Sequence, residues 1–132
     1  MKVLLINGSP HEKGCTYTAL NEIKKTLEQN DVEAEIFHIG TASVRGCIGC
    51  GGCGKNDGKC VFDDDVVNEI IEKAKTSDAF VFGSPVHYAA PAGALCAVLD
   101  RVFYAGGSHF KFKPGAAVVS CRRSGTTASI DC

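Results

Sequence analysis

Short apolar runs alternate along the chain with stretches of helical periodicity. The first apolar run, residues 3–6, stops at residues 7–10, which predicts a strand followed by a tight loop. A helix capped by Cys15 or Thr16 is expected next, because apolar residues then recur at helical spacing, at Leu20, Ile23 and Leu27. Residues 33–39 alternate between polar and apolar side chains, which predicts a half-buried strand with His38 as a solvated surface residue.

The second half of the chain repeats this alternation. The acids at residues 63–65 predict the N-cap and first turn of a helix, and the apolar run at 79–82, which stops at 83–85, predicts a buried parallel strand. A third helix is predicted from the apolar stripe Leu95, Val98, Leu99, Val102 and Phe103. A fourth strand is predicted at 116–120, followed by a loop and a short tail.

Strands that alternate with helices are typical of a doubly wound parallel α/β sheet, here expected as a single domain over residues 1–132. In such sheets, ligands bind beyond the carboxyl ends of the strands. Three loops leave those ends, at residues 7–16, 83–90 and 121–127. We therefore expect one pocket lined by all three loops.

The first of these loops has the features of an anion site. The unpaired N–H groups and the dipole of a helix N-terminus favour a negative charge. Ser9 and Thr16 add hydroxyl groups, and Gly8 and Gly14 allow close approach of the backbone. The loop has neither the nucleotide-triphosphate nor the dinucleotide glycine spacing. We expect a phosphate here, with an ordinary strand-to-helix turn as the alternative.

Charge and composition exclude several classes of partner. The 14 Lys and Arg residues against 15 Asp and Glu residues give a net charge of −1, so nothing indicates a nucleic acid or a membrane surface. No apolar run is long enough for a signal-peptide core or a membrane span. We expect a cytoplasmic protein whose eight cysteines are thiols, metal ligands or redox groups and not a disulfide framework.

A cysteine-rich loop is expected over residues 40–63, where no periodic pattern occurs. Its candidate metal ligands have the spacing C-x2-C-x2-C-x6-C and are Cys47, Cys50, Cys53 and Cys60. This compact spacing suits a 4Fe-4S cluster better than zinc, whose four-cysteine sites usually use two separate knuckles. Free thiols without metal, zinc and a regulatory disulfide stay open. Cys96, Cys121 and Cys132 are interpreted as ordinary buried or terminal thiols.

Several motifs in a fixed order resemble the NADPH-dependent FMN reductase family of flavodoxin-like proteins. They are Asn7-Gly8-Ser9-Pro10 with Gly14 and Thr16, Gly83-Ser84-Pro85-Val86-His87-Tyr88, Leu99-Asp100-Arg101, and Ser120-Cys121-Arg122-Arg123. The cysteine loop resembles the iron–sulfur flavoprotein branch. The resemblance implies a flavodoxin-like sheet with strand order 2-1-3-4.

Family members continue with a fifth strand and a last helix, which this sequence lacks before it stops at Cys132. The strand at 116–120 would then be an open edge. We expect a homo-oligomer or a truncated product, with the flank of the pocket beyond Arg123 incomplete or borrowed.

The resemblance also implies a set of FMN-binding residues in the three loops. They are Ser9, His11, Cys15 and Thr16 at the phosphate, Pro85, Val86, His87 and Tyr88 along the isoalloxazine ring, and Ser120, Arg122, Arg123 and Gly125 on its other flank. Cys15 departs from the family, in which Asn is more common at this position. From the residues alone, Tyr88 stays open as a surface aromatic, His87 as a structural histidine and the two arginines as solvated side chains.

The implied activity is an oxidoreductase that passes electrons from NADH or NADPH through FMN to an iron–sulfur cluster or a quinone-like acceptor, which is a small molecule or a protein. The cofactor supplies the chemistry, so no catalytic side chain is expected. An electron carrier without nicotinamide activity and a non-catalytic metal-binding module are the alternatives. A phosphoacceptor domain is disfavoured, because it needs acids where the first strand ends at Asn7.

Overall fold

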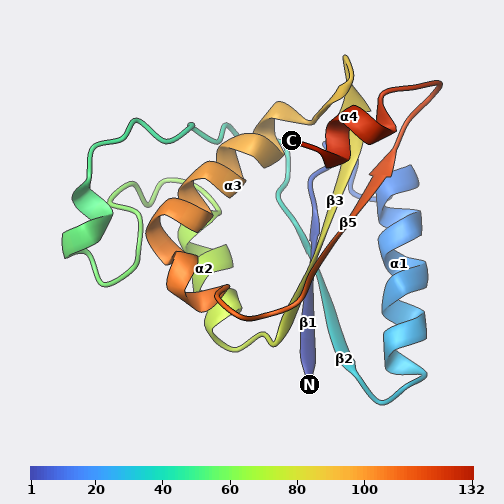
Figure 1. Ribbon diagram of the computed structural model, residues 1–132, viewed down its shortest axis with the longest axis horizontal. Coiled ribbons are helices and arrows are strands. Elements are labelled where there is room, and N and C mark those ends of the chain that lie inside the picture. Colours follow the sequence, from blue (N-terminus) through green and yellow to red (C-terminus); the bar gives the residue numbers. More distant parts are fainter.

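A computed structural model describes all residues, 1–132, and has one central sheet with helices on both faces (Figure 1). The strands are β1 (Lys2–Asn7), β2 (Glu33–His38), β3 (Ala79–His87), β4 (Ala90–Pro91) and β5 (Gly115–Ser120). The α-helices are α1 (Cys15–Glu28), α2 (Val67–Lys75), α3 (Gly93–Gly106) and α4 (Thr126–Ile130), and the 3₁₀ turns are η1 (Gly52–Lys55) and η2 (Gly107–His109).

The sheet consists of parallel strands in the order β2-β1-β3-β5, with the two-residue β4 paired antiparallel to the end of β3. Counted over the parallel strands alone, this order confirms the predicted 2-1-3-4, in which β5 is the fourth. The register places Asn7 beside Gly83, and Pro85 beside Ser120. The carboxyl ends of β1, β3 and β5 therefore lie at one edge of the sheet.

The core has one layer on each face of the sheet, because successive side chains of a strand point to opposite faces. Leu4 and Ile6 of β1 pack in the cluster formed with α2 and α3. Val3 and Leu5 pack in the smaller cluster that Leu20 of α1 completes. Figure 1 shows the same division, with α1 on one side of the sheet and α2 and α3 on the other. No helix combines the length and the apolar composition that a membrane crossing requires.

Strand β3 is longer than the apolar run that predicted it. The Gly83-Ser84-Pro85 segment indicated a loop, but β3 continues to His87 because residues 83–85 pair with β5 and residues 86–87 pair with β4. The chain then reverses into β4 through Tyr88 and Ala89, whose φ angles of 50° and 61° are both positive. Such a pair of angles is typical of a tight two-residue hairpin turn.

Two other elements differ from the sequence prediction. Residues 126–130, expected as a loop and tail, form the short helix α4 directly after Gly125, which has a φ of 94°. In α3, Leu95, Val98 and Val102 are buried as predicted, but Phe103 is 45% exposed and Arg101 is buried in its place. The hydrophobic pattern did not predict a buried Arg101, because the burial depends on pairing of its guanidinium with groups of the cysteine-rich loop, described below.

Candidate functional site

A cavity of about 400 Å³ lies at the carboxyl ends of β1, β3 and β5. Its lining comes from the three loops that the sequence predicted to meet, and consists of Ser9, His11, Gly14, Cys15, Thr16, Pro85, Val86, His87, Ser120, Cys121 and Arg122. The loops converge because the three parallel strands that precede them are neighbours in the sheet. The volume falls in the range of about 300–1,000 Å³ found for small-molecule sites.

Most of the residues implied as FMN ligands line this cavity, but three do not. Tyr88 is fully exposed at the tip of the β3–β4 turn, and Arg123 is exposed beyond the lining. Gly125 instead packs closely against the turn, since a side chain there would meet Ala89 at 2.8 Å. Cys121, interpreted from the sequence as an ordinary buried or terminal thiol, is exposed and lines the cavity.

The buried side chain of Asn7 fixes the shape of the first loop. Its Oδ1 accepts a hydrogen bond from the amide of Ser9 (3.1 Å), and its Nδ2 donates to the carbonyl of Glu12 (3.1 Å). The hydroxyl oxygen of Ser9 accepts from the amide of His11 (3.1 Å). Asn favours such local turns because its side chain bonds the backbone two residues on. Asn7 is therefore a positioning residue that the sequence analysis did not single out.

His38 was predicted to be a solvated surface residue, and this prediction was wrong. Strand pairing places His38 beside Asn7, and its Nε2 lies 2.8 Å from the carbonyl oxygen of Ser9. A carbonyl only accepts hydrogen bonds, so Nε2 is the donor. The position of His38 among the polar residues of the strand did not indicate this contact, because Ser9 is 29 residues away in the sequence.

Helix α1 begins at Cys15, and its N-cap is Gly14, without a side-chain cap. The prediction that Cys15 or Thr16 caps the helix was therefore wrong. The first N–H groups of a helix have no partner within the helix. Here they lie beside the hydroxyl groups of Ser9 and Thr16, which line the same cavity. This arrangement of donors suits an anion such as a phosphate monoester.

The four candidate metal ligands line a second hollow, between the cysteine-rich loop and α3. In Figure 1 this loop, which carries η1, lies beside α2 and α3 and away from the strand ends. The hollow is lined by Cys47, Ile48, Cys50, Gly51, Cys53, Cys60, Val61, Phe62, Arg101, Tyr104 and Ala105. All four cysteines are free thiols, and no three ligating side chains converge closely enough to hold a single metal ion. Metal binding by these cysteines stays a prediction.

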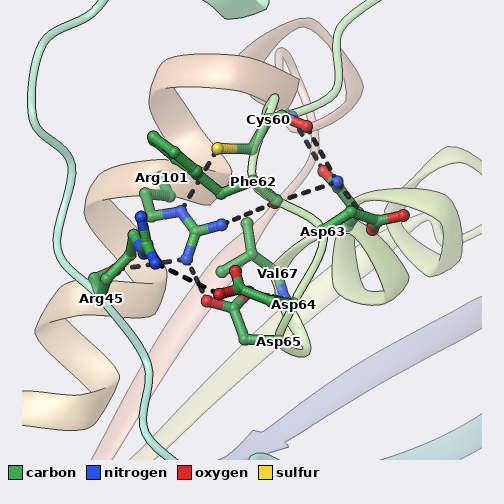
Figure 2. Close-up of polar contacts among 9 residues, drawn as sticks. Arg45, Cys60, Phe62, Asp63, Asp64, Asp65, Val67 and Arg101 are labelled. Atoms are coloured by element: carbon green, nitrogen blue, oxygen red, sulfur yellow. Dashed lines mark hydrogen bonds and ion pairs between the residues drawn. The ribbon is translucent and has the colours of Figure 1, made fainter.

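The guanidinium of Arg101 connects α3 to the cysteine-rich loop and is only 1% exposed (Figure 2). It forms an ion pair with the buried carboxylate of Asp65. It also donates to the carbonyl oxygens of Phe62 (2.9 Å) and Arg45 (3.3 Å), and its Nε lies 3.3 Å from the sulfur of Cys60. Burial lowers the pKa of Arg101, but the bonds to Asp65 and Cys60 outweigh it and raise the pKa above its usual value.

The backbone of Cys60 is held from α2. The Oδ1 of Asn68 accepts from the Cys60 amide (2.8 Å), and its Nδ2 donates to the Cys60 carbonyl (2.9 Å). The prediction that residues 63–65 supply the N-cap and first turn of this helix was wrong, because the N-cap of α2 is Val66 and the acid in its first turn is Glu69. Asp65 precedes the helix and accepts a hydrogen bond from the amide of Val67 (3.1 Å). That its other oxygen pairs with Arg101 was not predicted. The sequence contains one indication of this pairing, which is that Arg101 lies on the apolar face of α3.

Comparison with known proteins adds a family and a set of relatives. The family model described as NADPH-dependent FMN reductase matches residues 1–131. An iron–sulfur flavoprotein from Methanocaldococcus jannaschii is 36% identical over 101 residues, which cover 76% of this chain and 51% of that protein. Another from Archaeoglobus fulgidus is 35% identical over 101 residues, which cover 76% of this chain and 48% of that protein. The chain thus spans about half the length of these two relatives.

Solved structures show the same fold at low sequence identity. An apo NADH:FMN oxidoreductase superposes with a TM-score of 0.65 at 18% identity, over 98% of this chain and 63% of that one. An NAD(P)H:quinone oxidoreductase from Methanothermobacter marburgensis superposes with a TM-score of 0.66 at 20% identity, over 92% of this chain and 66% of that one. These similarities establish the flavodoxin-like architecture of the sheet and its helices.

Proposed function

This chain belongs to the NADPH-dependent FMN reductase family, and on that premise we propose that it binds FMN in the cavity at the carboxyl ends of β1, β3 and β5. We propose further that it passes electrons from NADH or NADPH through FMN to an iron–sulfur cluster or a quinone-like acceptor. The observation that carries the proposal is the convergence of the three predicted loops on one cavity with a helix N-terminus at its wall.

The phosphate of FMN would lie at the start of α1. The amides there attract an anion, and the hydroxyl groups of Ser9, Thr16 and Ser120 lie in the same lining. Asn7 and His38 hold the loop in shape through Ser9. A loop that is already ordered loses less conformational entropy when the ligand binds.

The ring of FMN would lie along the β3–β4 side of the cavity. Pro85 and Val86 offer an apolar wall there, and Arg122 offers a positive charge on the opposite flank. When bound, the flavin supplies the hydride and electron chemistry. The role of these residues is to orient the ring and to place positive charge where a reduced flavin is negative. Tyr88 does not line the cavity, and its proposed role is to contact the outer part of the bound flavin from the exposed tip of the turn.

The cysteine-rich loop would hold a 4Fe-4S cluster. Four free thiols line one hollow, and an N–H group of Arg101 lies at hydrogen-bonding distance from one of the sulfurs. Thiolates are the ligands of such clusters, so the donor set fits the group. The relatives named iron–sulfur flavoproteins support the same assignment.

Titration of flavin-free protein with FMN, followed by anaerobic addition of NADH or NADPH, tests the first part of the proposal. We expect binding with flavin fluorescence quenched, and bleaching of the bound flavin by at least one nicotinamide. Failure to bind FMN overturns the proposed site. Binding without bleaching by either nicotinamide favours an electron carrier instead.

Anaerobic purification with iron and sulfide analysis tests the cluster. We expect about four irons per chain and loss of most of the iron when any one of the loop cysteines, Cys47, Cys50, Cys53 or Cys60, is changed to serine. Cys96→Ser is the matched control, because Cys96 lies on α3 outside the hollow. Iron-free protein, or equal iron loss in the control, contradicts the assignment.

A further inference from the structure

Arg101 is buried, and its positive charge is balanced by the carboxylate of Asp65, whose side chain is 3% exposed. Figure 2 shows the guanidinium between α3 and the loop, with its three nitrogens directed to different groups. Nη1 and Nη2 bind Asp65 and the carbonyl oxygens of Arg45 and Phe62. Nε is left to donate to the sulfur of Cys60.

Cys60 is the most firmly held of the four candidate ligands. Its sulfur is bonded from α3 by Arg101, and its backbone is bonded on both sides by Asn68 of α2. Cys47 and Cys50 are exposed, and the sulfur of Cys47 receives only a local amide contact, from Gly49 at 3.5 Å. Cys53 lies in η1, and its thiol donates a long contact to the carbonyl oxygen of Tyr104 (3.9 Å). The Cys60 sulfur is therefore the one that the protein holds with a charged donor.

A hydrogen bond from a charged donor is stronger than one from a neutral donor, and it is stronger still where water is excluded. Donation to a sulfur stabilises negative charge on that sulfur. Hydrogen bonds to the sulfurs are one of the factors that set the reduction potential of an iron–sulfur site. A site that gains an electron becomes more negative, so such a bond favours the reduced form.

We propose that Arg101 is a positioning residue of the cysteine site, which orients the Cys60 sulfur through Nε–H and raises the reduction potential of an iron–sulfur cluster bound there. This inference rests on the proposed function, because it requires the cysteines to bind a cluster. It goes beyond that function by assigning a role to a side chain that is not a ligand and does not contact the flavin cavity.

The test compares variants of the whole chain reconstituted anaerobically with ferrous iron and sulfide. Removal of Arg101 alone would leave Asp65 buried without its counter-ion, so Arg101→Gln is combined with Asp65→Asn, which keeps the net charge unchanged. Arg101→Lys keeps a positive charge beside Asp65 and removes the fork that reaches the sulfur. Arg45→Gln is the control, because Arg45 is an exposed residue of the cysteine-rich loop. Its guanidinium pairs with Asp64 and not with a cysteine.

The readouts are the iron content and the midpoint potential of the cluster, followed by electron paramagnetic resonance. We expect both Arg101 variants to bind iron with a lower potential than the wild type, and Arg45→Gln to stay at the wild-type potential. Equal potentials in the wild type and Arg101→Lys, or an equal shift in Arg45→Gln, overturn the role of Arg101. A wild type that assembles no cluster overturns the proposed cluster itself, and this inference with it.

Discussion

The hydroxyl oxygens of Thr16 and Ser120 lie 3.0 Å apart, although 104 residues separate them in the sequence. Thr16 is in the first turn of α1 and is 2% exposed, and Ser120 is the last residue of β5. Both line the cavity. The contact ties the loop after β1 to the end of β5, so the two sides of the proposed phosphate site are held by one hydrogen bond.

Thr16→Val removes this hydrogen bond and keeps the shape of the side chain. We expect FMN to bind about tenfold more weakly, since a lost hydrogen bond of this kind costs about 1–1.5 kcal/mol. Fluorescence titration measures the change in Kd. Thr26→Val is the control, because Thr26 is exposed in the last turns of α1 and its hydroxyl donates to the carbonyl oxygen of Glu22, away from the cavity. An unchanged Kd in Thr16→Val would place the phosphate elsewhere.

His38→Ala tests whether the loop must be preorganised. The variant loses the hydrogen bond to the carbonyl of Ser9, so we expect several-fold weaker binding of FMN with a smaller change in stability, of about 1 kcal/mol. Calorimetric titration and thermal unfolding measure the two effects. His109→Ala is the control, because His109 lies in η2 and does not line the cavity. Equal FMN affinity in the wild type and His38→Ala would contradict the role of His38.

Gly8→Ala tests the close approach of the loop to the rest of the fold. A Cβ at Gly8 would lie 2.9 Å from both the carbonyl oxygen of Gly83 and the Cβ of Leu95. We expect a loss of about 1–3 kcal/mol in the free energy of unfolding, as for overpacked cores, measured by urea denaturation. Gly93→Ala is the control, since nothing lies within 4 Å of a Cβ there. A Gly8→Ala variant as stable as the control would show that the loop relaxes freely.

Glu35→Gln tests an ion pair that connects β2 to α2. Lys73 bonds the carboxylate of Glu35 at 2.6 Å, and Lys2 lies 3.1 Å from it. These contacts, that of Lys73 above all, lower the pKa of Glu35 below its usual value. A lowered pKa stabilises the fold above the unfolded-state pKa, near 4.3, and the contribution is lost as the pH falls through the folded-state pKa.

We therefore expect Glu35→Gln to be less stable than the wild type at pH 7, by at most about 1 kcal/mol because the carboxylate is partly exposed to solvent. The difference should shrink as the pH falls below the unfolded-state pKa of Glu. Urea denaturation at pH 7 and pH 3 measures it. Glu22→Gln, which removes an exposed pair on α1, should change stability less at pH 7. A deficit in Glu35→Gln that is the same at both pH values would contradict the ion-pair explanation.

Local pattern was enough to predict the main strands and the helices α1, α2 and α3, whereas the order of the parallel strands was predicted from the family resemblance. The apolar run of β1 indicates a strand buried on both faces, and helical spacing after residue 15 indicates the helix that covers one face. The convergence of three loops on one cavity also followed, because parallel strands bring their carboxyl ends to the same edge. These features depend on the spacing of apolar and polar residues along the chain, which can be read directly from the sequence.

Only the tertiary structure decided the contacts between segments that are far apart in the chain. His38 reaches the loop after β1, and Arg101 gathers groups from residues 36 to 56 positions away. Pairing with β5 extends β3 through a segment that otherwise indicates a turn. The physical reason is that a polar side chain takes whichever partner the fold brings within hydrogen-bonding distance, and the local pattern around that side chain does not specify the partner.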